Sequence, residues 1–129
     1  MKKELIICII IIFLIIIGNV ITQNYTKQCV YEINKELEIL KDECLKKDIG
    51  KEKIESKIAD IKNNWNVKKE KLSYYIEHDE LEKVETQIYN IQGFYEINKY
   101  SEIVPELDKC LFILKHIEEK TTLNIKNIF

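Results

Sequence analysis

Arginine is absent from the sequence, and all 20 basic residues are lysines. Alanine and proline occur once each, as Ala59 and Pro105, whereas isoleucine occurs 25 times and asparagine ten times. Lysine, isoleucine and asparagine have A/T-rich codons, so this bias indicates an AT-rich bacterial genome. The abundance of lysine is therefore no evidence for a nucleic-acid partner.

An excess of positive charge is missing as well. Beyond residue 22 there are 18 lysines against 21 aspartates and glutamates, which gives a formal net charge of −3 for this part of the chain. Phosphate recognition needs a basic footprint on the protein surface. We therefore expect that the protein binds no nucleic acid.

Glycine is too rare for a phosphate-binding loop, since only Gly18, Gly50 and Gly93 occur and they stand far apart. Neither a Gly-x-Ser-x-Gly motif nor a local signature of a nucleophilic cysteine is present. The sequence therefore predicts no catalytic residue and no cofactor, and we expect that the protein is not an enzyme.

The four cysteines form no recognisable framework. Cys8 lies in an apolar run, and Cys29 and Cys44 are 15 residues apart on one predicted helix, too far for a local disulfide. Cys110 lies on the apolar stripe of another helix. Because no C-x-x-C or H-x-x-x-H spacing occurs, the sequence predicts no metal site, and the thiols outside the apolar run are expected to be buried.

A long apolar run is the most prominent feature that the sequence does contain. Of the 17 residues from 5 to 21, 14 are Ile, Leu, Phe or Val. As a helix they span about 25 Å, slightly less than a hydrocarbon core of about 30 Å. A cleaved signal peptide is the alternative, but it needs small residues at positions −3 and −1 of the cleavage site. The nearest matches have Ile16 or Val20 at −3, so we predict an uncleaved transmembrane anchor over residues 5–22.

The charges beside this anchor predict its orientation. Lys2, Lys3 and the terminal amine precede the anchor directly, whereas Lys27 is the first basic residue that follows it. The positive-inside rule then predicts a single-pass protein of the cell membrane, with residues 1–4 as a cytoplasmic tail and residues 23–129 as an extracytoplasmic domain.

Apolar residues beyond the anchor recur at steps of three and four, and none alternate with the period of a strand. Helices are predicted at about 26–47, 51–78, 80–97 and 101–119, followed by an apolar C-terminal tail. Short connections make sequential helices antiparallel. The predicted fold is therefore all-α, a single N-terminal transmembrane helix followed by an antiparallel four-helix bundle. The alternative is a parallel coiled-coil stalk over 24–78, which Gly50 argues against.

The densest cluster of ionisable side chains is His78-Asp79-Glu80, which together with His116 offers ligands for a metal or groups for acid–base chemistry. A structural role explains the same cluster: His78 ends one helix, Asp79 caps the next, and Glu80 interacts favourably with its N-terminal dipole. Trp65 lies on an apolar stripe and is either a core residue or part of a ligand pocket. These five residues are the candidates for a functional site.

Several segments together resemble one bacterial family. They are a Lys-flanked N-terminal span, Trp65 in a charged helix, Tyr75-Ile76-Glu77-His78-Asp79-Glu80-Leu81, Leu114-Lys115-His116-Ile117 and the closing Asn127-Ile128-Phe129. Over essentially its whole length the chain resembles the domain of unknown function 4363 of clostridia and related low-GC Gram-positive bacteria. The resemblance implies a small membrane-anchored protein but no mechanism. Asp79 departs from the family's His-Glu-Glu motif while it keeps the charge, which favours the capping role.

Three functions of different classes remain open. The leading hypothesis is a membrane-tethered helical interaction or scaffold module. Its partners are the lipid bilayer, through residues 5–22, and another membrane or envelope protein, with a homo-oligomer as a further option. The second is an extracytoplasmic sensor that binds a small ligand beside Trp65. The third is a metal-dependent enzyme, which requires the imidazoles of His78 and His116 to converge.

A topology reporter tests the anchor. A reporter enzyme that works only outside the cytoplasm, fused after Phe129, should be active, because Lys2 and Lys3 hold the N-terminus inside. The fusion should also stay in the membrane fraction at full length. An inactive reporter would contradict the orientation, and release of a shortened soluble form would identify a cleaved signal peptide instead.

Overall fold

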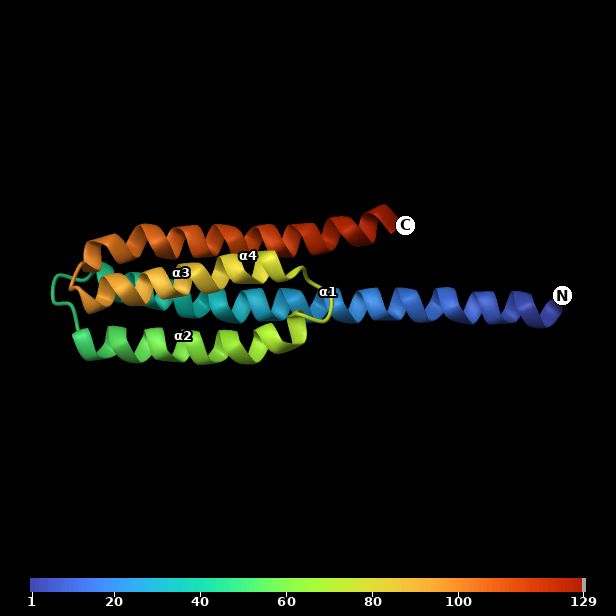
Figure 1. Ribbon diagram of the computed structural model, residues 1–129, viewed down its shortest axis with the longest axis horizontal. Coiled ribbons are helices and arrows are strands. Elements are labelled where there is room, and N and C mark those ends of the chain that lie inside the picture. Colours follow the sequence, from blue (N-terminus) through green and yellow to red (C-terminus); the bar gives the residue numbers. More distant parts are fainter. Residues whose placement is uncertain (129) are drawn as a thin grey trace.

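The computed structural model describes the backbone of residues 1–128 and the side chains of residues 1–122. This part of the chain contains four helices and no strand (Figure 1). The helices are α1 (Lys2–Leu45), α2 (Lys51–Leu72), α3 (His78–Glu96) and α4 (Tyr100–Ile128). The prediction of an all-α chain with a helical bundle is confirmed. One difference is that the apolar segment and the first helix of the bundle are a single continuous helix, α1.

The polar residues at the middle of α1 do not interrupt it, and their hydroxyls find hydrogen-bond partners within the helix. The Thr22 hydroxyl donates a hydrogen bond to the carbonyl of Asn19 over 3.0 Å, and the Thr26 hydroxyl donates to the carbonyl of Thr22 over 2.8 Å. Threonine hydroxyls often bond back to the preceding turn of a helix in this way. The first half of α1 is long and apolar enough to cross a membrane, a property that a signal sequence shares.

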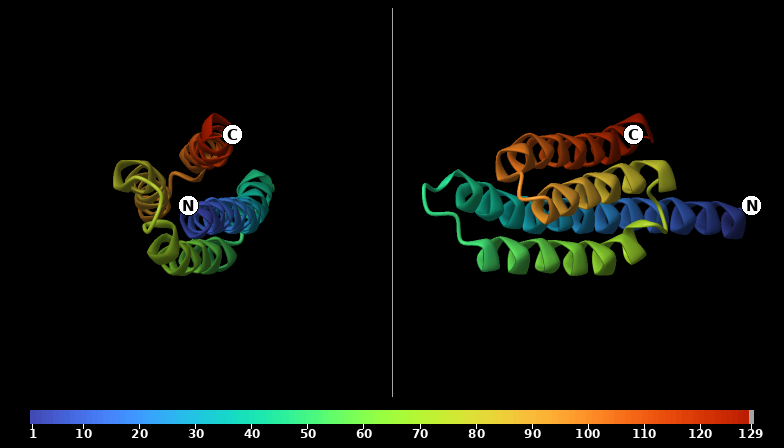
Figure 2. Two further views of the ribbon diagram at one scale, coloured as in Figure 1. Left: turned by 90° about the vertical axis from the view of Figure 1, so that its right-hand side faces the viewer. Right: turned by 60° about the vertical axis from the view of Figure 1, so that its left-hand side comes forward.

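The second half of α1 packs with α2, α3 and α4 in a closed square. Contacts join α1 to α2, α2 to α3, α3 to α4, and α4 back to α1, whereas the described residues of diagonal helices do not meet. Figure 2 shows this square from its end, with the first half of α1 projecting beyond it. The bundle is antiparallel, as expected for short connections.

The core of the bundle consists of the apolar stripes that the periodicity predicts. Each helix contributes residues at steps of three and four, and isoleucine and leucine dominate. The fully buried members include Ile33, Leu37, Leu40, Ile54, Leu72, Leu81, Val84, Ile103, Leu107 and Cys110. Such spacing places one face of each helix toward the bundle axis.

Of the first and third turns, only the third follows a familiar rule of helix termination. Residues 46–50 separate α1 from α2, and Gly50 is the residue just before α2. After α3, Asn98 adopts a left-handed conformation with φ of 59°. The amide of Asn98 then bonds to the carbonyl of Tyr95, and the amide of Lys99 to that of Phe94. This is a Schellman motif with asparagine in the place that glycine usually takes.

The remaining turn and the end of α4 differ from the predicted bounds. The second helix ends at Leu72 instead of near residue 78. Tyr75, which has the spacing of the stripe, lies in the turn that follows and contacts α1. The coiled-coil stalk over 24–78 is excluded by the antiparallel turn at 46–50. The predicted apolar tail is helical up to Ile128 as part of α4. The side chains of residues 123–129 lie outside the described part of the chain.

The four cysteines are free, as the sequence predicts. Cys29, Cys44 and Cys110 are buried in the bundle, whereas Cys8 is exposed on the apolar half of α1. Burial raises the pKa of the Cys110 thiol to about 12 and that of the Cys44 thiol to about 11. Because the thiolate is the reactive form, these two thiols are inert at neutral pH.

Candidate functional site

The His78-Asp79-Glu80 cluster lies at the start of α3, in a different arrangement from the predicted one. His78 is the first residue of α3, not the last of α2, and its Nε2 lies 2.9 Å from Oε1 of Glu82. Glu77 precedes the helix, and no side chain caps it by a hydrogen bond. The prediction that Asp79 caps this helix is therefore wrong. Asp79 lies exposed in the first turn, where its negative charge still interacts favourably with the helix dipole.

Glu80 is the one member of the cluster that turns into the bundle, and it is only 8% exposed. Its Oε1 lies 3.6 Å from Nζ of Lys120 on α4 and 3.5 Å from Nζ of Lys83. Its Oε2 is buried without a hydrogen-bond partner among the described residues. Glu80 stands four residues before the core residue Val84, so its spacing already placed it at the edge of the apolar stripe.

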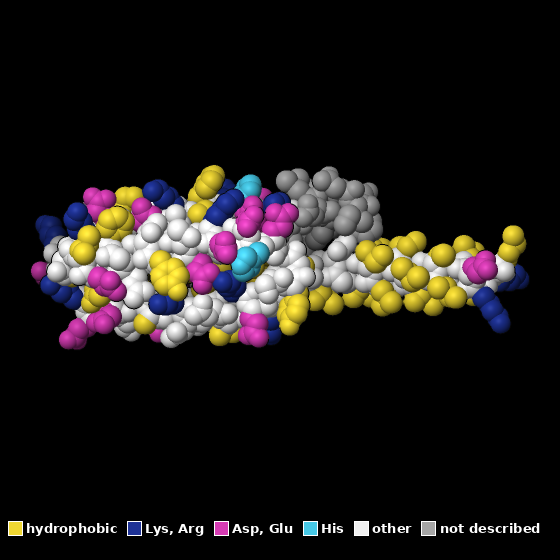
Figure 3. Space-filling view, in the orientation of Figure 1, with side chains coloured by type: hydrophobic (Ala, Val, Ile, Leu, Met, Phe, Trp, Pro, Cys, Tyr) yellow, Lys and Arg dark blue, Asp and Glu magenta, His cyan; other side chains and the backbone are white. Residues whose placement is uncertain are grey.

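The second imidazole does not join the first. His116 is exposed on α4, and the partner of His78 is Glu82. Figure 3 shows the histidine side chains (cyan) as two separate patches on the surface. Within the described residues, no group of three or more histidine, cysteine, aspartate and glutamate side chains is arranged to hold a metal ion. In this part of the chain, the side chains of the cluster therefore lack the arrangement that the metal-enzyme hypothesis requires.

Trp65 is a core residue with 2% of its surface exposed. The hollow beside it, which Ile88 and Tyr89 of α3 also line, has a volume of about 10 Å³. One water molecule needs about 10–15 Å³, so no organic ligand fits there. The indole Nε1 is buried without a hydrogen-bond partner among the described residues. The structural interpretation of Trp65 thus holds, and the sensor hypothesis loses the pocket that it placed beside this residue.

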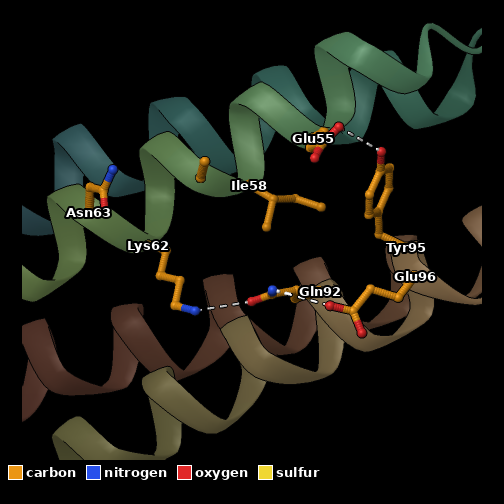
Figure 4. A pocket seen from close by; sticks show the side chains of 8 residues that line it. Glu55, Ile58, Lys62, Asn63, Gln92, Tyr95 and Glu96 are labelled. Carbon is orange, nitrogen blue, oxygen red and sulfur yellow. Dashed lines mark hydrogen bonds between the residues drawn. The ribbon is translucent and has the colours of Figure 1, made fainter.

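A groove that the sequence analysis missed lies between α2 and α3 (Figure 4). Its volume is about 380 Å³, within the range of small-molecule sites. Ala59, the only alanine, is an exposed small residue next to the stripe residue Ile58, and both line this groove. The polar groups around it already pair with one another: Tyr95 donates to Glu55 over 3.2 Å, Lys62 to Gln92 over 3.2 Å, and Gln92 to Glu96 over 3.3 Å. No unpaired buried group therefore marks it as a ligand site.

A second surface feature follows the seam between α3 and α4. Phe112 on α4 is 72% exposed, although it is large and apolar. Hollows of about 390 and 450 Å³ lie along this seam and share Gln87 and Ile113 in their walls. Charged residues of both signs, among them Lys83 and Asp108, surround them. An exposed aromatic side chain beside shallow hollows is typical of a protein-binding surface.

Polar side chains join α1, the α2–α3 turn and α4 at the end of the bundle where the apolar half of α1 begins. We call Thr22, Gln23, Thr26, Tyr75 and Thr122 the polar collar. The hydroxyls of Thr26 and Tyr75 are 2.7 Å apart, and Tyr75 also donates to the carbonyl of Thr22 over 3.2 Å. Gln23 donates to the hydroxyl of Thr122 on α4 over 3.3 Å. Thr26 is completely buried. The collar therefore fixes both neighbours of α1 at its base.

The fold and its surface define a small antiparallel four-helix bundle that extends from a long apolar N-terminal helix. The chain belongs to the family described as Domain of unknown function (DUF4363), whose sequence model matches residues 20–128. No curated protein and no solved structure matches the chain. The match begins where the apolar run ends, so the bundle is what the family shares with this chain.

The buried carboxylate of Glu80 generates a stability test. Replacing Glu80 by methionine should leave the free energy of unfolding unchanged or raise it by about 0–2 kcal/mol, because a partly unsatisfied buried charge is removed. Lys83 and Lys120 stay largely exposed, so neither is left as a buried charge. Denaturation of the full chain in detergent measures the change, with Asp79→Asn as a control that should shift it by less than about 1 kcal/mol. A loss above about 2 kcal/mol for Glu80→Met would show that the ion pair stabilises the α3–α4 contact.

Proposed function

We propose that the protein is a membrane-tethered helical interaction module that presents its bundle outside the cell membrane. The observation that carries this proposal is the continuity of α1, which links the apolar segment to the bundle core without a flexible joint. A helix of 44 residues is about 66 Å long, enough to cross a bilayer and still form one wall of the bundle. The apolar segment and the bundle then move as one body.

The surface of the first half of α1 supports its role as an anchor. Its isoleucine, leucine and phenylalanine side chains are exposed, and no other described helix covers the most apolar stretch. Figure 3 shows them as a nearly continuous apolar surface, in contrast to the mixed charges of the bundle. An exposed apolar surface of this extent requires lipid or another protein. Lys2 and Lys3 favour a cytoplasmic N-terminus and an extracytoplasmic bundle.

A role in binding, and not in catalysis, fits the chemistry of the bundle. Cys29, Cys44 and Cys110 are buried, and His78 and His116 lie on the surface away from any cluster of metal ligands among the described residues. The α2–α3 groove has the volume for a small ligand, but its polar groups satisfy one another. A small-ligand sensor is therefore the second candidate, and this groove is where it would bind.

The α3–α4 seam around Phe112 is the surface that we propose for a partner. The partner is another membrane or envelope protein or a second copy of the chain, because a tethered bundle meets such molecules at high local concentration. Aromatic side chains at the centre of an interface contribute most of its binding energy. Phe112 lines one of the two adjoining hollows of the seam, and we propose that it is the centre of the interface.

Crosslinking in the native membrane tests this function. Full-length protein should form a defined crosslinked product, identified by mass spectrometry, and Phe112→Ser should reduce it about tenfold, as expected for the loss of an aromatic hot spot. Tyr31→Ser is the matched control, since Tyr31 is a similarly exposed aromatic residue on α1. It should leave the product unchanged. Equal loss in both variants, or a product insensitive to Phe112→Ser, would contradict the proposed interface.

A further inference from the structure

We propose that the turn between α2 and α3, residues 73–77, sits in the headgroup layer of the membrane and that Tyr74 anchors the base of the bundle to lipid. This inference rests on the proposed transmembrane role of the apolar segment. It adds a second point of contact with the lipid surface, formed by the bundle itself. Its ligand is the polar–apolar boundary of a phospholipid bilayer.

The polar collar fixes the height of this turn along α1. The Tyr75 hydroxyl contacts the carbonyl of Thr22 and the hydroxyl of Thr26, so it lies between these two residues along the axis. Thr22 and Thr26 are one helical turn apart, about 6 Å. The apolar run ends at Ile21, directly before Thr22. The turn is therefore within about one helical turn of the end of the apolar surface, and Figure 1 shows it as the part of the α2–α3 hairpin nearest to that segment.

The length of the apolar run leaves no spacer between the lipid and the bundle. Its 17 residues reach about 25 Å, whereas the hydrocarbon core is about 30 Å thick. All of the run is therefore needed inside the core, and a span that is too short draws its flanking residues toward the bilayer. The headgroup layer extends roughly 5–7 Å beyond the core on each side. This is the height at which the collar places residues 73–77.

The side chains of the turn suit this layer. Tyr74 is 85% exposed, whereas its neighbour Tyr75 is turned toward α1 as part of the collar. The backbone amide of Tyr74 is already bonded to the carbonyl of Lys71, and the Ser73 hydroxyl to that of Glu70. The high exposure of Tyr74 means that its phenol ring makes little contact with the described part of the fold. Tyrosine is enriched at membrane interfaces because its ring prefers the acyl-chain boundary and its hydroxyl prefers water.

A second attachment would hold the bundle upright. One transmembrane helix leaves a domain free to tilt and to rotate about the helix axis. A contact through Tyr74, offset from α1 by the width of a helix pair, restricts both motions. The α3–α4 seam with Phe112 would then face sideways, toward molecules in the same membrane.

Fluorescence quenching by brominated lipids tests the inference. The full-length Tyr74→Trp variant is reconstituted into phosphatidylcholine–phosphatidylglycerol vesicles whose acyl chains carry bromine either near the headgroup or near the terminal methyl. Trp65 is the only native tryptophan, and its burial in the core makes it a constant background. Tyr89→Trp is the matched control. Tyr89 is also exposed, but it lies 11 residues further along α3 from His78, about 16 Å from the base.

The emission added by Tyr74→Trp should be quenched, most strongly by bromine near the headgroup, whereas the emission added by Tyr89→Trp should not change. If the protein floats with the vesicles but bromine quenches the added emission of neither variant, the lipid contact is overturned and the anchor is left intact. Protein that does not float with the vesicles would overturn the anchor, and the lipid contact with it.

Discussion

The unbroken backbone of α1 across its polar middle is the constraint on which the rest of the structure depends. At Thr22 and Thr26 the sequence changes from apolar to polar, and a turn at this point would separate the apolar segment from the bundle. The helix instead continues through this point, and the threonine hydroxyls donate to carbonyls of the preceding turn, so these buried or half-buried groups have partners inside the helix. The same residues are the acceptors and donors to which Tyr75 attaches the α2–α3 turn. One short polar stretch thus lies inside the continuous helix and also determines how far the α2–α3 turn lies from the apolar segment.

The closed packing of the four helices places Cys29, Cys44 and Cys110 inside the bundle, away from solvent. Large aliphatic side chains and Trp65 fill the axis, and the cysteines that could be nucleophiles are among them. Burial raises the pKa of Cys110 to about 12, which keeps that thiol protonated. The candidate binding features lie on the surface of the bundle. They are Phe112 along the α3–α4 seam, the α2–α3 groove, and Tyr74 at the base. All three are surfaces that a binding partner could contact, as the proposed function requires.

Local sequence pattern predicted the helices well because each of their core faces repeats at steps of three and four. The residues that recur at these steps, among them Ile33, Leu37, Ile54 and Leu107, are buried in the core, and the predicted break between residues 47 and 51 is a turn. The errors occurred where a side chain acts across helices. Tyr75 fits the stripe of the second helix by spacing, yet it contacts α1.

The candidate site was predicted only in part, for the same reason. Capping by Asp79 depended on where α3 begins, and Glu77, not Asp79, precedes it. Because α3 begins at His78, both His78 and Glu80 lie on the same helix. His78 then points to solvent and Glu80 into the bundle. The groove beside Ala59 depends on the distance between two helices, which no local pattern encodes. Only its unusual alanine was visible in the sequence.

Hydrogen–deuterium exchange of the full-length protein in lipid nanodiscs tests the continuity of α1 most directly. The amides of residues 22–28 lie beyond the apolar run, at or outside the hydrated headgroup layer and not in the hydrocarbon core, so their exchange reports mainly on helical structure. A continuous helix predicts that they exchange as slowly as residues 33–40 in the bundle core, because both stretches are hydrogen-bonded and packed. Exchange as fast as that of the 46–50 turn would contradict it and would make the apolar segment and the bundle two bodies joined by a flexible linker.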